Sequence, residues 1–245
     1  MHQKEVNARS PLRVLEQSIH GGLGRGNIGV VVARHGVGKT AFLVGVALDD
    51  LMRGKNVLHI SLDQTAEKVR TFYDEIFAEL CHSEGLEDVW KVHLGLERHR
   101  RIHSYLEGSF ALSKLRDTLG FMRMHGEFVP EAIVIDGFDF ETATDAEMGT
   151  LRETARDLDA EVWMSAVTTR DAERNERGVP EPVAHLEPTI DVILSMAHDG
   201  RAVHVGLHKD HENPDVSDLK LALDPTTLLL IREQDGAAAE RGSEA

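Results

Sequence analysis

Cysteine is nearly absent from this sequence, since Cys81 is the single one among 245 residues. One thiol cannot form an internal disulfide, so the cross-linked frameworks of small secreted proteins are excluded. Long apolar runs are also missing, because no stretch reaches the roughly 18 apolar residues of a membrane span. Residues 1–10 are polar and lack the apolar segment of a signal peptide. Together these absences predict a soluble cytoplasmic protein with no membrane contact.

Basic residues are outnumbered: 27 lysines and arginines face 42 acidic residues, which gives a formal net charge of −15. Nucleic-acid binding draws much of its affinity from neutralised phosphates, so this balance disfavours such partners unless a local basic patch exists. Histidine is plentiful, with 14 residues. His208 and His211 are three apart, and we interpret them as exposed loop histidines rather than metal ligands. Hydrophobic residues make up 41% of the chain, enough for a full core.

The most informative stretch follows an apolar run at residues 28–32 and precedes an amphipathic segment. It reads Ala33-Arg34-His35-Gly36-Val37-Gly38-Lys39-Thr40-Ala41 and matches G-x-x-x-x-G-K-[ST] except for alanine at the first glycine. In such a loop, main-chain N–H groups and a helix N-terminus surround a phosphate. Lys39 would contact the β- and γ-phosphates of ATP, and the Thr40 hydroxyl would bind Mg²⁺. The alternative is an ordinary glycine turn before a helix.

A second candidate lies at the end of another apolar run, residues 132–135, which is followed by Asp136. A buried parallel strand that ends in aspartate places its carboxylate at the carboxyl edge of the sheet, beside the phosphate loop. We therefore expect Asp136 to hold Mg²⁺ through water. The alternative is a turn-forming aspartate before Gly137.

The hydrolytic base has three candidates. Asp63 follows a predicted strand and would orient water at the γ-phosphate, although it could equally cap the next helix. Asp139 and Glu141, just beyond Asp136, compete for this role. Thr168 ends another predicted strand and could sense the γ-phosphate, or form a plain strand-to-loop turn.

Strands alternate with helices along most of the chain, which predicts an α/β fold with a mostly parallel sheet covered on both faces. The last strands follow one another without helices, so that edge should be antiparallel. We expect strands at 28–32, 56–62, 89–96, 132–135, 162–167, 190–197, 203–207 and 228–232, and helices at 39–51, 66–80, 105–125 and 146–158. Residues 1–27 should form an arm or cap, 28–232 one domain, 170–188 a polar loop and 233–245 a disordered tail.

The span from residue 21 to about 230 resembles the RecA-like ATPases, close to the DnaB-type helicase core and the KaiC/RadA branch. Residues 22–27 resemble the glycine-rich entry of that group, and residues 61–67 the segment that holds its catalytic glutamate. Residues 205–209 resemble a late strand whose basic residue reaches a neighbouring subunit's site. The resemblance implies Mg²⁺-dependent ATP binding between the subunits of a ring or filament.

Two departures from that pattern matter for activity. Asp63 stands where the family has glutamate, and its carboxylate is one methylene shorter. Misplacing a catalytic group by this much can cost about 10²-fold in rate. Lys209 would act on the γ-phosphate across the interface, whereas His211 replaces the family's second basic residue.

The resemblance leaves three functions open: a nucleotide-driven switch or assembly ATPase with a protein partner, a DNA-associated ATPase, and a nucleotide-binding protein with little turnover. Residues 168–188, which match the family's channel loop, hold three arginines against five acidic residues and no aromatic residue. Such a loop is poor at gripping phosphates or stacking bases, which favours the first function. A denser basic cluster is formed by Arg98, Arg100, Arg101 and two histidines, His99 and His103. It could bind an anion, a nucleic acid or an acidic partner, or it could be a solvated loop. No guanine-reading motif is present, which favours ATP over GTP.

Overall fold

A nine-stranded sheet forms the centre of the protein, whose computed structural model describes residues 1–105, 108–213, 216 and 218–233. The strands are β1 Ile28–Ala33, β2 Val57–Ser61, β3 Arg100–Ser104, β4 Ala132–Asp136, β5 Glu161–Val167, β6 Val192–His198, β7 Val203–Asp210, β8 Leu221–Leu223 and β9 Leu230–Arg232. Their order is β3-β2-β4-β5-β1-β6-β7-β8-β9. The first six strands in this order are parallel to one another, and β7, β8 and β9 are each antiparallel to the strand before them. The predicted α/β class with late antiparallel strands is confirmed, and this arrangement fits a RecA-like fold.

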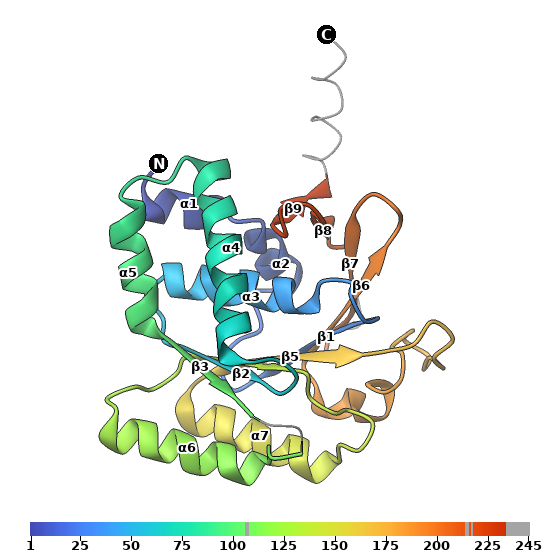
Figure 1. The fold of residues 1–245 in the computed structure, drawn as a ribbon. Helices are drawn as coiled ribbons and strands as arrows, with labels where there is room; N and C mark the ends of the chain where they lie inside the picture. Colours follow the sequence, from blue (N-terminus) through green and yellow to red (C-terminus); the bar gives the residue numbers. More distant parts are fainter. Residues whose placement is uncertain (106–107, 214–215, 217, 234–245) are drawn as a thin grey trace.

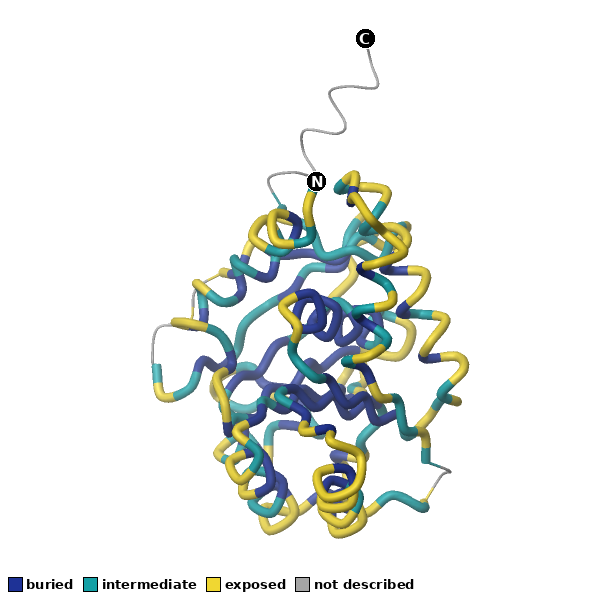
Figure 2. The backbone as a smooth tube through the Cα atoms, turned by 90° about the vertical axis from the view of Figure 1, so that its left-hand side faces the viewer, coloured by how far each residue is buried: buried dark blue, intermediate teal, exposed yellow. Residues whose placement is uncertain are grey.

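Helices cover both faces of the sheet (Figure 1). They are α1 Gln3–Arg9, α2 Leu12–Ser18, α3 Lys39–Met52, α4 Ala66–Glu84, α5 Val89–His99, α6 Leu112–His125, α7 Asp145–Leu158 and the 3₁₀ helix η1 Ala184–Thr189. One core joins α1 to α5 to one face, and a second joins α6, α7 and η1 to the other. Parallel strands with two covered faces need apolar residues throughout, which explains why all six residues of β1 are buried. Figure 2 shows these buried strands in the middle of the molecule, between helices with exposed outer sides.

The strand order brings four carboxyl ends to one edge. β1 pairs with β5 on one side and β6 on the other, and β5 separates β1 from β4. Ser61 at the end of β2 pairs with Asp136 at the end of β4, and Ala33 of β1 pairs with Val167 of β5. The loops after β1, β2, β4 and β5 therefore gather at this edge, where ligands of open α/β sheets bind.

Several predicted elements are wrong. Residues 89–96 are not a strand but most of α5, and the strand that follows is β3 at Arg100–Ser104. Val92 and Leu96 are buried four residues apart, the spacing of a helix face, while Trp90 and Leu94 are exposed. The helix expected from residue 105 begins at Leu112. The short strand β8 was missed, and the polar loop at 170–188 leads into η1.

The first 27 residues form two short helices that pack on α3. Leu12, Leu15 and Ile19 are buried in the core that also contains α3, whereas Val14 is only partly buried. Ion pairs reinforce the contact: Arg13 pairs with Asp49, and Arg53 with Glu16 at 2.6 Å. This segment thus shares a core with the helix that follows the phosphate-loop motif.

Two further predictions concern membranes and the C-terminal tail. Among the described helices, none is both long and apolar enough to cross a membrane. The predicted tail lies outside the described residues from position 234 onward. The division into an arm, one domain and a tail stays a prediction.

Candidate functional site

The motif loop lies between the end of β1 and the start of α3, as the sequence predicts. Gly36 and Gly38 have φ values of +75° and +113°, in the left-handed region that side chains avoid. Gly38 also lies against Leu223 of β8, since a Cβ built there would be 2.6 Å from the leucine Cδ2. Ala33 is the last buried residue of β1 and is not among the residues with positive φ. Alanine therefore fits where the motif usually has its first glycine.

The amino end of α3 faces the same space as the loop. Lys39, Thr40 and Ala41 form its first turn, where helix N–H groups have no intrahelical acceptor and carry partial positive charge. Lys39 is buried, and its Nζ donates to the carbonyl oxygens of Ala33 at 3.3 Å and Arg34 at 3.2 Å. Burial lowers the pKa of this ammonium, while the negative charges of Asp136 and Asp63 oppose the shift. A bound anion would offset the cost of burying the lysine.

Thr40 and Asp136 meet directly, although β5 lies between β1, which leads to Thr40, and β4, which ends in Asp136. Thr40 Oγ1 donates to Asp136 Oδ2 at 2.6 Å. Asp136 is 2% exposed, and its other oxygen accepts a hydrogen bond from Ser165 Oγ of β5. A hydroxyl beside a fixed carboxylate supplies the oxygen ligands that Mg²⁺ prefers. The pair therefore fits the predicted metal site.

Ser165 was not predicted from the sequence. Its hydroxyl also accepts a hydrogen bond from the Gly137 N–H at 2.9 Å, so it fixes both Asp136 and the start of the next loop. Ser165 lies on β5, the strand between β1 and β4. Finding it required the strand order, which no motif in the sequence reveals.

Replacing Ser165 with alanine should lower the free energy of unfolding by about 1–3 kcal/mol, the cost of leaving buried polar groups unpaired. On the sequence prediction that Asp136 holds Mg²⁺, the variant should also raise the Mg²⁺ concentration needed for nucleotide binding, because Asp136 loses its orienting partner. Urea denaturation and Mg²⁺ titrations would measure both effects. Ser195→Ala on β6 is the matched control. Equal behaviour of the two variants would contradict a positioning role for Ser165.

Asp63 lies at the loop after β2, against the residue that follows Asp136. Gly137 packs against it so closely that a Cβ on this glycine would be 3.1 Å from Asp63 Cγ. Ser61 Oγ donates to Asp63 Oδ1 at 3.4 Å. Partial burial and the negative charge of Asp136 raise the pKa of Asp63, a shift that is common among catalytic carboxylates.

Asp63 is not the N-cap of α4, which was the alternative role predicted for it. The N-cap of α4 is Thr65, whose side chain accepts from the Lys68 N–H at 3.3 Å. Of the two competing bases, Asp139 binds its own loop, accepting from the Glu141 N–H at 3.0 Å and from a threonine hydroxyl. Glu141 is exposed. Asp63 thus lies against Gly137, the residue after Asp136, and is not the N-cap of α4.

Thr168 is tied to the motif strand. Its N–H donates to the Ala33 carbonyl at 3.1 Å, and its hydroxyl donates to the Glu181 carbonyl at 2.6 Å. It lines a pocket of about 660 Å³ that the motif loop borders on one side. Val203, Leu223, Pro225 and Leu228 form an apolar wall of the same pocket. Thr168 therefore lines the pocket beside the motif loop with its hydroxyl bonded internally, and its role as a γ-phosphate sensor stays a prediction.

Lys209 is held within its own chain. It is 7% exposed, and its Nζ donates to the Glu187 carbonyl of η1 at 2.8 Å. Its predicted role in a neighbouring subunit would require this bond to break, and it stays a prediction. The exposed-loop interpretation of the nearby histidines is wrong, because His208 belongs to β7 and both are partly buried. His211 bonds Asp210 at 2.8 Å and the Leu23 carbonyl at 3.0 Å.

The predicted basic cluster does not form one solvated loop. Arg98 and His99 end α5, whereas Arg100, Arg101 and His103 lie on the edge strand β3. Arg100 is 6% exposed and pairs with Glu97 of α5. The charge of Arg100 is therefore paired inside the protein. Arg98 and Arg101 are the exposed arginines of this group.

Comparison with known proteins gives one informative match. A DnaB-like replicative helicase of Enterobacteria phage T4 is 26% identical over 140 residues, covering 51% of this chain and 29% of the helicase. The chain thus spans less than a third of that relative's length. No protein-family model matches the sequence. The distant similarity and the mostly parallel sheet agree with a RecA-like fold.

Proposed function

We propose that this protein binds ATP with Mg²⁺ at the loop between β1 and α3 and hydrolyses it. The observation that supports this most strongly is the meeting of Thr40 with Asp136, at 2.6 Å, beside the buried Lys39. Loop and helix amides would surround the β-phosphate, and Lys39 would leave its two carbonyl partners for the β- and γ-oxygens. Thr40 and Asp136 would hold Mg²⁺, which supplies charge neutralisation on the phosphates. Asp63 would orient and deprotonate the attacking water.

The apolar wall of the 660 Å³ pocket gives the base of the nucleotide a place to lie. Leu223 contacts the motif loop at Gly38, and Pro225 and Leu228 extend the wall away from it. A flat base buried against aliphatic side chains gains from the hydrophobic effect without specific hydrogen bonds. The antiparallel strands at this edge would therefore complete the nucleotide site.

The cellular role that the charge favours is a nucleotide-driven switch or assembly ATPase acting on proteins. The segment 168–188 has more acidic than basic residues, and the whole chain has a formal net charge of −15. An acidic surface repels nucleic acid and does not hinder protein partners. RecA-like ATPases of this kind assemble, so sedimentation should show a larger species with a non-hydrolysable ATP analogue. A monomer with and without the analogue would count against an interfacial role for Lys209.

A DNA-associated ATPase is the second candidate, and the similarity to a replicative helicase favours it. Phosphate release should be measured with the protein alone, with single-stranded DNA and with candidate protein partners. Stimulation by DNA, together with a low-salt gel shift lost on neutralising Arg98 and Arg101, would support this candidate over the switch. Nucleotide binding without measurable turnover under all three conditions would leave a binding protein as the function.

A further inference from the structure

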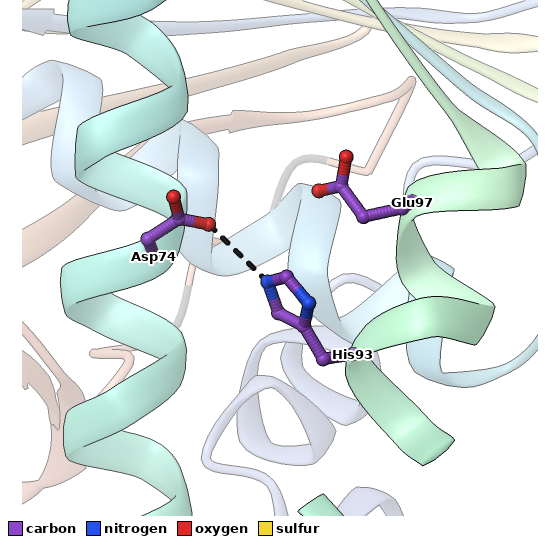
Figure 3. A group of neighbouring side chains, drawn as sticks. All are labelled: Asp74, His93 and Glu97. Carbon is purple, nitrogen blue, oxygen red and sulfur yellow. Dashed lines mark hydrogen bonds and ion pairs between the residues drawn. The ribbon is translucent and has the colours of Figure 1, made fainter. Parts of the chain in front are cut away.

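Three side chains that can ligate a metal come together between α4 and α5, away from the motif loop. Figure 3 shows Asp74 of α4 pointing toward His93 and Glu97 of α5. His93 and Glu97 are four residues apart and therefore lie on one face of their helix. His93 Nε2 and Asp74 Oδ1 are 3.4 Å apart, and one ligand atom from each of the three residues lies within 4.8 Å of the others.

Buried neighbours hold two of the three ligands in place. Arg100 contacts Oε1 of Glu97, and its guanidinium lies 4.4 Å from the centre of the Tyr73 ring. The His93 ring packs against Phe77, with ring centres 5.6 Å apart. Outer partners that fix the orientation of a carboxylate and an imidazole are the usual surroundings of a metal site.

We propose that Asp74, His93 and Glu97 bind a divalent zinc ion that ties α4 to α5. Imidazole nitrogen and carboxylate oxygens are zinc ligands, with bonds of about 2.0–2.2 Å. Ligand atoms at that distance from a tetrahedral ion are about 3.4 Å apart, so the His93–Asp74 pair has the required spacing. Glu97, whose ligand atom lies within 4.8 Å of the other two, would need to move by at most about 1.4 Å. All three side chains are at least one-third exposed, which leaves room for this adjustment, and Glu97 would make it against its contact with Arg100.

The metal would take the place of the proton between His93 and Asp74. In the present arrangement a ring N–H of His93 donates to Asp74, and zinc would bind both atoms instead. The nitrogen ligand distinguishes this site from the Thr40–Asp136 pair, whose oxygen atoms suit Mg²⁺. With three protein ligands, the fourth position remains open to water.

The test is a zinc titration of the nucleotide-free protein in competition with a chromophoric chelator. We expect the wild type to bind one equivalent of zinc. Both His93→Ala and Asp74→Asn should bind zinc more than about 100-fold more weakly, because replacing even a residue that only contacts a ligand lowers metal affinity by about 10- to 100-fold. Asp74→Asn is the sharper variant, because its amide oxygen still accepts from His93 and the helices stay joined. His82→Ala, which removes an exposed histidine near the end of α4, should bind like the wild type.

Thermal unfolding separates a metal site from a simple hydrogen bond. In chelator, Asp74→Asn should unfold at the wild-type temperature, and added zinc should raise the unfolding temperature of the wild type alone. The proposal would be overturned if the wild type, His93→Ala and Asp74→Asn all bound the same number of zinc ions with the same affinity. A wild type that binds no zinc at micromolar concentrations would also overturn it. Neither result depends on ATP binding at the motif loop.

Discussion

Replacing Lys39 with methionine is expected to weaken Mg²⁺–ATP binding by about 100-fold. That factor corresponds to about 3 kcal/mol, the upper range for a hydrogen bond to a charged group. Methionine keeps the apolar stem that Lys39 buries and removes the ammonium that would contact the phosphates. Isothermal titration calorimetry measures the change in affinity, with Lys4→Met on the exposed face of α1 as the control.

The folded state must be checked alongside this affinity, because Lys39 also bonds two carbonyls of the loop. Circular dichroism on heating would show whether the variant remains folded at the titration temperature. Wild-type affinity in a folded Lys39→Met protein would remove the motif loop from the account. The same loss in Lys4→Met would show that general charge, and not the loop, binds the nucleotide.

Asp63→Asn should leave nucleotide affinity within a few-fold of wild type and reduce the rate of phosphate release by at least about 100-fold. Asparagine has the same shape but cannot accept the proton of the attacking water, and a general base contributes about 10²–10⁴-fold. Single-turnover phosphate release at saturating ATP is the appropriate measurement. Asp139→Asn and Glu141→Gln are the matched controls. If Asp63→Asn keeps full turnover and one of the two controls loses it, the residue changed in that control is the base.

The pH dependence of turnover gives an independent check on Asp63. A base must be deprotonated to act, so activity should fall as the pH drops through its pKa. Burial and the nearby Asp136 raise this pKa, so the decline should begin at a higher pH than for an ordinary aspartate near 3.8. In Asp63→Asn the residual rate should lose this dependence.

Asp63→Glu tests whether the shorter side chain of aspartate limits the rate of hydrolysis. Glutamate carries its oxygens one methylene further, and better placement of water is worth up to about 10²-fold. A rate above wild type in this variant would show that the short side chain limits turnover. An unchanged rate would mean that water is already well placed by Asp63.

The parts of the candidate site that were predicted are those encoded by contiguous residues. The loop from Ala33 to Thr40 and the aspartate that ends β4 could be located because strand, turn and helix signals lie side by side in the sequence. Ser165 could not be found this way, since its role depends on β5 lying between β1 and β4. The burial of Lys209 depends on η1, a helix within a segment that was expected to be a loop.

The strand wrongly predicted at residues 89–96 hid the cluster of Asp74, His93 and Glu97. In an extended strand, residues four apart such as His93 and Glu97 would lie on one face but about 13 Å from each other, too far to share an ion. The apolar residues of this segment include Gly95 and β-branched valines, which weaken a helical pattern. Burial of Val92 and Leu96 against the core decides for the helix, and that is a tertiary effect.

The most direct test of the central claim is a crystal structure with Mg²⁺ and a non-hydrolysable ATP analogue. The account predicts phosphates surrounded by the main chain of residues 36–41, with Lys39 on the γ-phosphate and the metal between Thr40 and Asp136. A nucleotide bound elsewhere, with Lys39 still on the carbonyls of Ala33 and Arg34, would contradict it.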